Sequence, residues 1–332
     1  MKNIHRLPTS TDVARLAGVS QSAVSRTFSR RGSVSDQTRA KVVAAADQLG
    51  YRPNALPAIM QVQRSQMIAL VTGRMQNPFY ARVLQALTNA LQQQGQQVLV
   101  SCVDSDHALD DAINQSMRYR VDAIVSALAV ITPATAESLS RTGIPVVAFN
   151  NVQNAPGVSS VNSDNETAGR RAAAHLMTRG CQHFGFIHGP QESPAAQQRW
   201  QGFSTYLAEH GVSDVASARG DFSYQSGAAA ALQLWREGSG PQGLFCANDL
   251  MALGAMDTLR QTLRVKIPDD VAVIGYDNTD ASAWGAYQLS SFDQDIEMMA
   301  KETLAILEHY RSSDQSIVRT VPALLVARAS SV

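Results

Sequence analysis

From Met67 onward, apolar segments of strand length alternate with amphipathic helical segments, and this alternation restricts the fold more than any other feature. Continuous apolar strands separated by helices indicate parallel sheets that are covered on both faces. The predicted strands are Met67–Thr72, Gln97–Val103, Ala123–Ala127, Pro145–Asn150, His183–His188, Ala216–Gly220, Gly243–Ala247 and Val271–Tyr276. The predicted helices are Tyr80–Gly95, Ala108–Tyr119, Thr132–Arg141, Asn165–Arg179, Pro194–His210, Ser223–Glu237 and Asp249–Leu263.

A fresh strand–helix series begins near Asp164, and a helix at about Asp295–Tyr310 and a last strand near Thr320–Val326 follow it. We therefore expect a core at 67–328 that contains two doubly wound subdomains. The N-terminal subdomain would comprise about 67–164 and 293–326, and the C-terminal subdomain about 165–292. A ligand is expected in the cleft where the carboxyl ends of the two sets of strands face each other.

Before the core, the segment from Thr11 to Arg26 predicts two short helices joined by a tight turn. The first would run from Asp12 to Ala17 and end at Gly18, where the backbone favours positive φ. Ser20 would cap a second helix from Gln21 to about Phe28. The expected inward residues are Val13, Leu16 and Ala17, and then Ala23, Val24 and Phe28. The polar outer face of the second helix suits a recognition helix in a DNA major groove, although a solvated αα-hairpin has the same pattern.

A third helix is expected after Ser35, with Asp36 in its first turn and Gly50 at its end. The residues at helical spacing on it are Val42, Val43, Ala46 and Leu49. These helices define a helix-turn-helix domain at 8–53, and 54–66 would form a hinge helix and linker. Pro57 lies near the start of that short segment and disfavours the helical conformation at Leu56.

The net charge of zero conceals an asymmetry between the two parts of the chain. Residues 1–60 contain nine Lys and Arg but three acidic residues, and so this segment is strongly basic while the remainder is acidic. A basic head is expected to bind a polyanion, although a basic solvated face would look the same.

Several other classes of protein are disfavoured by what the sequence lacks. It has neither a stretch long enough to span a membrane nor a signal peptide, which leads us to expect a cytoplasmic protein. The three cysteines have neither metal-binding nor disulfide spacing and suit small buried residues. Phosphate-loop, dinucleotide, nucleophile-elbow and zinc-protease motifs are missing, and so we expect neither an enzyme nor a cofactor.

The head segments TDVARLAGVSQSAVSR and VSDQTRAKVVAAADQLGYRPNAL resemble the DNA-binding head of the LacI/GalR family of bacterial transcription regulators. The core segments NPFY, GIPVVAFN, RWQGF, ANDLMALGAM and VAVIGYDNTD resemble its effector core, in the same order along nearly the whole chain. The resemblance implies a small all-α helix-turn-helix head joined to a periplasmic-binding-protein-like α/β core. It also implies a homodimeric repressor of carbohydrate-related genes that binds a pseudo-palindromic double-stranded operator. A sugar or sugar derivative in the cleft would control operator affinity allosterically, and the protein would be nucleoid-associated when bound.

Residues of the head acquire expected roles from this resemblance. Gln21, Ser22 and Arg26 match base- and phosphate-facing positions of the recognition helix, and Ser20 and Ser25 match backbone-contacting ones. The remaining expected DNA-binding residues are Thr11, Tyr51, Asn54, Leu56 and Met60, with Met60 at the position of the family's minor-groove wedge leucine. The family's linker usually contains ALARSL, whereas this chain has ALPAIM, and so Pro57 puts the hinge helix in question.

In the core, the resemblance implies an effector site formed by Phe79, Asn150, Arg199, Asn248, Asp249, Asp277 and Trp284. A guanidinium at Arg199 can bind vicinal hydroxyls or a carboxylate, although a surface helix arginine is the plain alternative. Helix capping alone could explain Asp249, and packing alone could explain Phe79. Asn150 replaces the aspartate of many members, and Trp284 is expected as either a sugar platform or a lid.

Two further alternatives share features of this chain. A solute-binding protein or sensor could use the same core without operator-specific regulation, but the basic head and the absence of a signal peptide disfavour it. An interaction module could use the helix-turn-helix for protein binding. Tetramer-forming leucine heptads are not present after the last strand, and so a dimer is expected.

Overall fold

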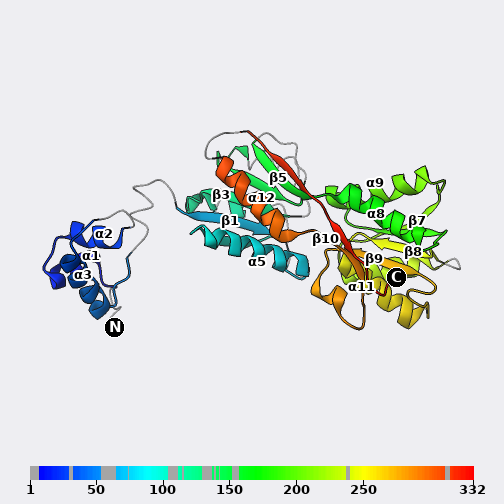
Figure 1. Cartoon of the computed structure of the whole chain (residues 1–332), viewed down its shortest axis with the longest axis horizontal. Coiled ribbons are helices and arrows are strands. Elements are labelled where there is room, and N and C mark those ends of the chain that lie inside the picture. Colours follow the sequence, from blue (N-terminus) through cyan, green and yellow to red (C-terminus); the bar gives the residue numbers. More distant parts are fainter. Residues whose placement is uncertain are drawn as a thin grey trace. The chain divides into compact units, whose positions relative to one another are not determined.

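A computed structural model of the 332-residue chain describes residues 7–29, 33–53, 65–73, 75–103, 111–113, 116–128, 137, 140–141, 143–151, 157–236, 240–310 and 315–332. The chain forms two compact units, Met1–Ser65 and Gln66–Val332 (Figure 1). The expected hinge helix at 54–66 falls almost entirely on residues 54–64, which lie outside the described residues. No helix of the described part is long and apolar enough to cross a membrane.

The N-terminal unit contains α1 (Ser10–Ala17), α2 (Gln21–Phe28) and α3 (Asp36–Leu49). Helix α1 begins earlier than predicted because Thr9 and Asp12 form a reciprocal capping box at its start. Gly18 and Gly50 end α1 and α3 with φ of 65° each, in the left-handed region that glycine adopts without strain.

The small core of this unit differs in part from the sequence prediction. Its buried apolar residues are Val13, Ala14, Val24, Val42, Ala45, Ala46 and Tyr51. The prediction that Leu16 and Phe28 point inward was wrong, because three short helices enclose only a narrow stripe of each helix. Val43 and Leu49, at helical spacing on α3, are exposed as well, and all four residues are at least 36% exposed. Thr27 is buried instead of Phe28, and its hydroxyl donates to the Ala23 carbonyl.

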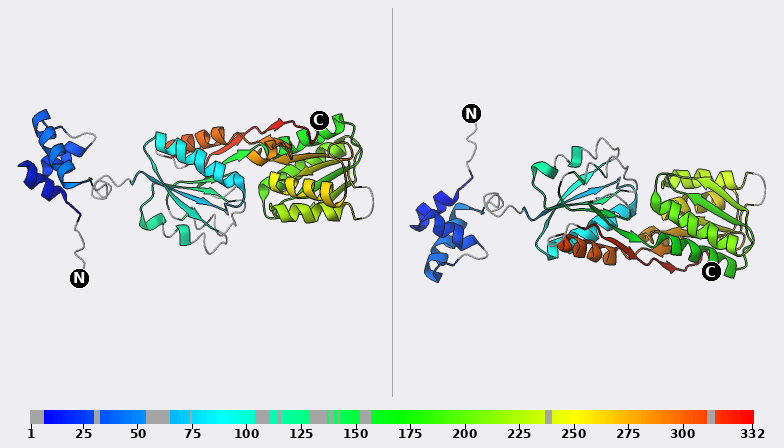
Figure 2. Two further views of the ribbon diagram at one scale, coloured as in Figure 1. Left: turned by 90° about the horizontal axis from the view of Figure 1, so that it is seen from below. Right: turned by 90° about the horizontal axis from the view of Figure 1, so that it is seen from above.

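The N-terminal half of the core is a six-stranded parallel sheet in the order β11-β5-β4-β3-β1-β2. Helices α5 (Pro78–Gln93) and α12 (Ile296–His309) pack on one face of it (Figure 2). The strands are β1 (Met67–Thr72), β2 (Gln97–Cys102), β3 (Ala123–Ala127), β4 (Val146–Phe149), β5 (Val158–Ser163) and β11 (Val318–Val321).

The C-terminal half repeats this arrangement in the order β12-β10-β9-β8-β6-β7, with only β12 antiparallel to its neighbour. Helices α8 (Asn165–Thr178) and α9 (Pro194–Glu209) pack as one pair, and α10 (Tyr224–Leu234) and α11 (Asp249–Asp257) as another. A π-helical turn, η1 (Thr258–Thr262), continues α11, where the sequence predicted one uninterrupted helix. The strands are β6 (Phe184–His188), β7 (Val215–Arg219), β8 (Gly243–Cys246), β9 (Ala272–Tyr276), β10 (Ser290–Asp293) and β12 (Leu324–Val326).

The chain passes between the two halves three times, after β5, after β10 and between β11 and β12. Sequence patterns missed β5 and β10, and they joined β11 and β12 into one strand. Pro322 lies between these last two strands, which belong to different sheets, so that one segment supplies an edge strand to each half. Figure 1 shows this segment in red, running along both halves.

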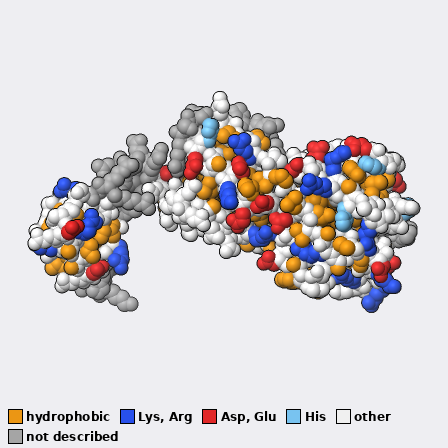
Figure 3. All heavy atoms as spheres, viewed as in Figure 1, with side chains coloured by type: hydrophobic (Ala, Val, Ile, Leu, Met, Phe, Trp, Pro, Cys, Tyr) orange, Lys and Arg blue, Asp and Glu red, His pale blue; other side chains and the backbone are white. Residues whose placement is uncertain are grey.

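The largest hydrophobic cluster lies in the C-terminal half and includes several phenylalanines that contact one another. On the face shown in Figure 3, acidic and basic side chains are mixed over the surface of the core. The three cysteines differ in solvent exposure. Cys246 is buried and Cys181 is partly exposed. Cys102 is exposed, contrary to the expectation of a buried residue, because β2 is an edge strand.

Candidate DNA-binding surface and ligand cavity

Helix α2 presents the polar face that the sequence predicted. Ser20 caps it by accepting a hydrogen bond from the Ala23 amide, and Gln21, Ser22, Ser25 and Arg26 are all exposed. These residue types can donate to base edges and to phosphates.

Two of these side chains are held within the unit. The Gln21 amide donates to the Ser10 hydroxyl at 2.9 Å, and the Arg26 guanidinium donates to the Ser22 carbonyl. Both interactions are solvent-exposed, and so they can exchange for DNA contacts at small cost.

The other expected DNA-binding positions are distributed differently. Thr11 is exposed on α1. Tyr51 is buried in the core of the N-terminal unit, with its ring centroid 6.0 Å from that of Phe28. Asn54, Leu56 and Met60 lie outside the described residues.

In the core, a cavity lies between the two halves and has ≈ 400 Å³ of empty space, which includes open solvent. Aromatic rings and polar groups from both halves line it: Asn77, Phe79, Tyr80, Ala127, Leu128, Phe149, Asn150, Ser193, Ala195, Arg199, Phe222, Asn248 and Asp277. Five of the seven predicted effector-site residues are therefore brought together, while Asp249 and Trp284 are not among the lining residues.

Arg199 lies on α9, and close helix packing fixes its position. An added Cβ at Gly169 would lie 2.2 Å from the Arg199 carbonyl oxygen, and one at Gly202 would lie 1.9 Å from the Glu166 carbonyl oxygen. Only glycine at these two positions lets α8 and α9 approach so closely. The backbone of Arg199 is thus held against α8.

The Arg199 side chain is 3% exposed and is oriented by three contacts. Its Nε donates to Asn165 Oδ1 at 2.8 Å, its Nη1 donates to the Ala247 carbonyl, and its Cζ lies 3.5 Å from the centroid of the Tyr276 ring. These contacts compensate the burial of the charge. The arginine is a buried cavity residue, and the alternative of a surface helix arginine was wrong.

Asp277 follows β9 and is also buried at the cavity. Its φ is 112° and that of the next residue, Asn278, is 46°, so two consecutive non-glycine residues have positive φ. Such conformations cost of order 1–3 kcal/mol each and persist only where neighbouring contacts hold them.

The Asp277 carboxylate accepts a hydrogen bond from Gln294 Nε2 at 2.6 Å. Burial raises the pKa of this carboxyl well above its ordinary value, and nearby Arg199 opposes that increase. An Asp277 that holds a proton can donate a hydrogen bond as well as accept one.

Asn150 reaches the same carboxylate indirectly, because its Nδ2 donates to Oε1 of Gln294 at 2.9 Å. Gln294 is fully buried and lies on the segment that joins β10 to α12. Asn150 has a φ of 56° and follows β4. A polar chain therefore runs from the N-terminal half to Asp277 in the C-terminal half.

Three other polar lining residues are helix caps. The side chains of Asn77, Ser193 and Asn248 accept hydrogen bonds at the N-termini of α5, α9 and α11. The positive ends of three helix dipoles thus border the cavity.

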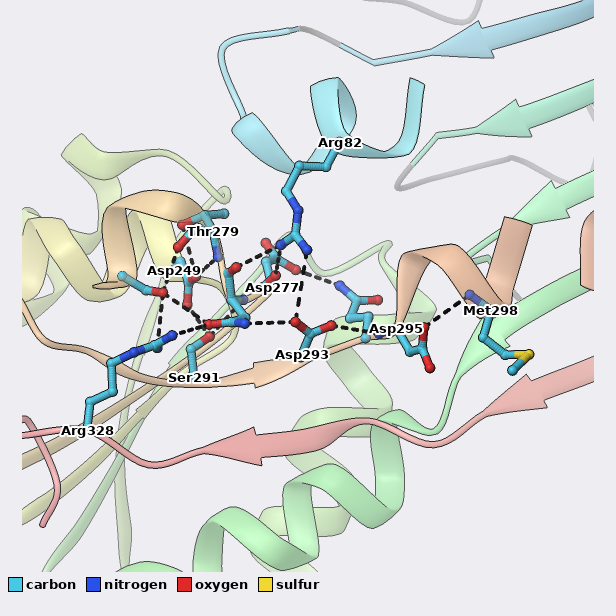
Figure 4. Close-up of polar contacts among 12 residues, drawn as sticks. Arg82, Asp249, Asp277, Thr279, Ser291, Asp293, Asp295, Met298 and Arg328 are labelled. Atoms are coloured by element: carbon cyan, nitrogen blue, oxygen red, sulfur yellow. Dashed lines mark hydrogen bonds and ion pairs between the residues drawn. The ribbon is translucent and has the colours of Figure 1, made fainter. Parts of the chain in front are cut away.

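Asp249 does not cap α11, because Asn248 has that role. Instead, its carboxylate accepts from the Thr279 amide and hydroxyl and from the Ser291 hydroxyl (Figure 4). It is fully buried, and burial raises its pKa. The alternative that capping alone explains Asp249 was wrong, because this carboxylate joins α11 to the loop after β9 and to β10.

Trp284 ends the short 3₁₀ helix η2 (Asp280–Ala283) and is 60% exposed, outside the cavity. The lining residues Tyr80 and Phe222 and the capping residue Asn77 were not among the residues predicted from the sequence. The segment NPFY could have indicated Asn77, since asparagine before proline at a helix start is a capping signal. Phe222, with a φ of 70° in a loop, offered no pattern. No cluster of three or more metal-ligating side chains occurs among the residues that the structure describes.

A helix-turn-helix unit on the same chain as a two-sheet core, with a cavity lined by aromatic and polar side chains, indicates a ligand-responsive DNA-binding regulator. Comparison with known proteins agrees at the level of family. Residues 9–54 match the family model of bacterial regulatory proteins, lacI family. Residues 65–297 match that of periplasmic binding proteins and the sugar binding domain of the LacI family.

Similar proteins extend over nearly the whole chain. The transcriptional repressor PurR of Photobacterium profundum is 28% identical over 97% of this chain and 98% of its own length. The transcriptional regulator CelR of Thermobifida fusca is 31% identical over 91% of each. The crystal structure of the lac repressor dimer bound to operator and the anti-inducer ONPF has a TM-score of 0.90 at 26% identity, covering 98% of this chain and 100% of that one. The chain belongs to the LacI family of bacterial regulatory proteins, and it is a DNA-binding transcriptional regulator with an effector-binding core.

Proposed function

We propose that the protein represses carbohydrate-related genes in the bacterial cytoplasm, as a homodimer on a pseudo-palindromic operator. A sugar or sugar derivative in the core cavity changes its affinity for that operator. The observation that carries this proposal is the pair of buried side chains, Arg199 and Asp277, that face a cavity in a chain whose N-terminal unit exposes a polar recognition helix.

The DNA-binding part of the proposal is supported by the chemistry of α2. Gln21 and Arg26 are side chains that read base edges in pairs of hydrogen bonds, and Ser20, Ser22 and Ser25 suit phosphate contacts. Thr11 and Tyr51 would assist in docking, and Asn54, Leu56 and Met60 would contact DNA from the hinge. A two-fold dimer would recognise two half-sites, and the similar lac repressor is bound to its operator as a dimer.

The choice of ligand is supported by the lining of the cavity. The rings of Phe79, Tyr80, Phe149 and Phe222 offer apolar faces, while Arg199, Asp277 and Asn150 offer donors and acceptors. Sugars combine apolar ring faces with a rim of hydroxyls, and this lining is complementary to that combination. We assign ligand contact to Phe79, Asn150, Arg199, Asn248 and Asp277, and a supporting role to Asp249.

The domain boundaries also belong to this proposal: a DNA-binding domain at 8–53, a hinge at 54–66 and a ligand-binding core at 67–328. The expected assignment of 293–326 to the N-terminal subdomain is revised, because β10 and β12 pair with each other in the C-terminal sheet. The N-terminal subdomain is then about 67–164 plus 294–321, and the C-terminal subdomain about 165–293 plus 324–326. The protein acts by binding rather than by catalysis, because its family consists of DNA-binding regulators.

The test has two parts, one for operator DNA and one for the small-molecule ligand. Duplexes bound by the full-length protein are selected from a random pool, and their affinity is measured by fluorescence anisotropy at several salt concentrations. We expect selection of an inverted repeat and a steep loss of affinity with salt. In the second part, a thermal-shift screen of sugars, sugar phosphates and sugar acids should find a stabilising compound that changes operator affinity.

Arg26→Ala is the informative variant for the first part. It should weaken binding to the selected duplex more than binding to random DNA, because a base contact carries specificity and a phosphate contact does not. Arg15→Ala, an exposed arginine on α1, provides the charge-matched control. Failure to select any duplex would leave only a solute-binding or sensing function.

A further inference from the structure

Arg82, on α5 of the N-terminal half, makes its polar contacts across the core with the other half. Its Nη1 donates to the carbonyl oxygen of Asp277 at 2.9 Å and to that of Asn278 at 2.7 Å. Its Nη2 lies 3.9 Å from Asp293 Oδ2. Figure 4 shows the guanidinium directed from α5 into the turn that follows β9.

Arg82 donates hydrogen bonds to the turn at Asp277 and Asn278, which is strained and which places Asp277 at the cavity. Both carbonyls belong to residues with positive φ, 112° at Asp277 and 46° at Asn278. A strained backbone keeps its conformation only when surrounding contacts fix it, and Arg82 supplies two of these contacts from outside the C-terminal half.

The C-terminal half holds the same turn from its other side. Asn278 donates its amide hydrogen to Ser291 Oγ and its Nδ2 hydrogen to Asp293 Oδ2, and its Oδ1 accepts from Arg328. These contacts tie the turn to β10 and to the C-terminal segment. If the two halves move relative to each other, the contacts within the C-terminal half can persist, while those of Arg82 must stretch or break.

We propose that Arg82 is a positioning residue that couples the Asp277 carboxylate in the cavity to the relative position of the two halves of the core. Ligand bound at Asp277 shifts the turn, and Arg82 transmits that shift to α5 in the half that follows the linker. This inference rests on the proposed ligand site. It assigns a role in coupling to a residue outside the cavity lining.

Coupling between the ligand cavity and DNA binding requires an element with two arrangements, whose populations change when either the ligand or DNA binds. The element here is the set of two hydrogen bonds and one ion pair that the Arg82 guanidinium makes across the two halves. Since Arg82 has a side chain that is 34% exposed, its removal leaves no buried cavity. Its loss should therefore change the balance between positions of the two halves more than the stability of the fold.

The test compares Arg82→Gln with Arg260→Gln in the full-length chain. Arg260 also donates from Nη1 to a backbone carbonyl, that of Ala286, but both residues belong to the C-terminal half. The two variants lose the same charge and the same kind of bond, and only one of them loses a link between the halves.

Distances between the halves are measured by pulsed electron paramagnetic resonance. Spin labels are placed at the exposed Cys102 of β2 and at Gln233→Cys on α10, in a Cys181→Ser background diluted with unlabelled protein. We expect Arg82→Gln to broaden the distance distribution or to shift its mean, and Arg260→Gln to match the unsubstituted chain. An unchanged distribution in Arg82→Gln, with or without a lower melting temperature, would overturn the proposal.

A second measurement links the residue to DNA binding. With the duplex selected from the random pool and no added compound, Arg82→Gln should change affinity by about fivefold, the lower range of allosteric coupling, while Arg260→Gln should not. Equal affinities of the two variants would contradict the proposed coupling. If no duplex is selected by the unsubstituted chain, the repressor function fails, and the distance measurement still decides the role of Arg82.

Discussion

The two halves of the core share a strand order and differ in what they bury. In the C-terminal half, the buried charged groups Arg199, Asp249 and Asp277 are each hydrogen-bonded. In the N-terminal half, the described residues include four buried polar atoms without a hydrogen-bond partner, on Thr72, Gln96, Ser126 and Asn162. It lines the cavity with the aromatic rings of Phe79, Tyr80 and Phe149.

This difference suggests that the two halves have different roles in the cavity although they share a strand order. We propose that the C-terminal half supplies the charged groups, Arg199 and Asp277, that would select a ligand by hydrogen bonding, while the N-terminal half supplies most of the aromatic rings that would cover it. Asn77 and Asn150 are polar exceptions in the N-terminal half, and Phe222 is an apolar exception in the C-terminal half. Close packing of α8 against α9 fixes the backbone of Arg199, since glycines bring the two backbones into contact there. Four changes would contradict or refine this comparison.

The largest effect is expected from Gly202→Ala. A methyl group there would lie 1.9 Å from the Glu166 carbonyl oxygen, so α8 and α9 must separate. We expect the free energy of unfolding to fall by about 3 kcal/mol, the upper range for overpacking, in urea denaturation. Gly285→Ala, where an added methyl meets nothing within 4 Å, should change it by less than about 0.5 kcal/mol. A small effect at Gly202 would show that the packing of α8 against α9 is not rigid.

Arg199→Ala should come next. It should remove the thermal stabilisation by any sugar found in the screen, a loss of about 2.7 kcal/mol when the ligand is present at 100 times its dissociation constant. Operator binding without ligand should persist. Calorimetric titration that finds unchanged affinity would exclude Arg199 from the site.

Phe79→Ala should have a smaller effect on the same ligand, about a tenfold loss of affinity, because it removes an apolar face and no hydrogen bond. Calorimetry on both variants tests the division directly. If Phe79→Ala loses as much affinity as Arg199→Ala, then the apolar half selects the ligand as strongly as the polar half does.

The remaining test is a pH dependence of stability that involves Asp277. Because burial raises the pKa of Asp277, the native state binds this proton more tightly than the unfolded chain does. Its contribution to the free energy of unfolding is therefore fully present below the unfolded pKa, near 3.9, and is lost as the pH rises through the folded pKa. The free energy of unfolding of the natural chain, minus that of Asp277→Asn, should thus decrease as the pH rises from about 4 to about 8, because only the natural chain must bury an ionised carboxylate at the higher pH. Urea titrations across this range measure it, and an increasing difference would mean that Arg199 dominates over burial.

The fold was predictable where the chain is regular and apolar. Buried parallel strands such as Met67–Thr72 and Ala123–Ala127 have the predicted bounds. The strands β5 and β10 were missed because they are rich in serine. Polar strands lack the apolar signal even when, as here, all residues of β5 and all of β10 except Asp293 are buried. Ser159, Ser290 and Ser291 are instead hydrogen-bonded to side chains or backbone distant in the sequence.

The cavity residues were also predictable where they lie on regular elements. Arg199 and Asp277 lie at the ends or on the faces of regular elements within recognisable motifs, so their positions could be inferred. Phe222 lies in an irregular loop, and Arg82 acts on backbone carbonyls that no side-chain pattern reveals. Trp284 was expected near the ligand because it follows Asp277 closely, but the 3₁₀ helix between them places it outside the cavity lining.

The segment from Val318 to Val326 has a consequence for how the protein is made. It supplies β11 to one sheet and β12 to the other, and the neighbours it covers, β5 and β10, consist almost entirely of buried residues. On a ribosome, both sheets therefore stay open at one edge until this last segment emerges. During that interval the nascent chain exposes two unpaired strand edges at once, the kind of surface that chaperones shield from aggregation.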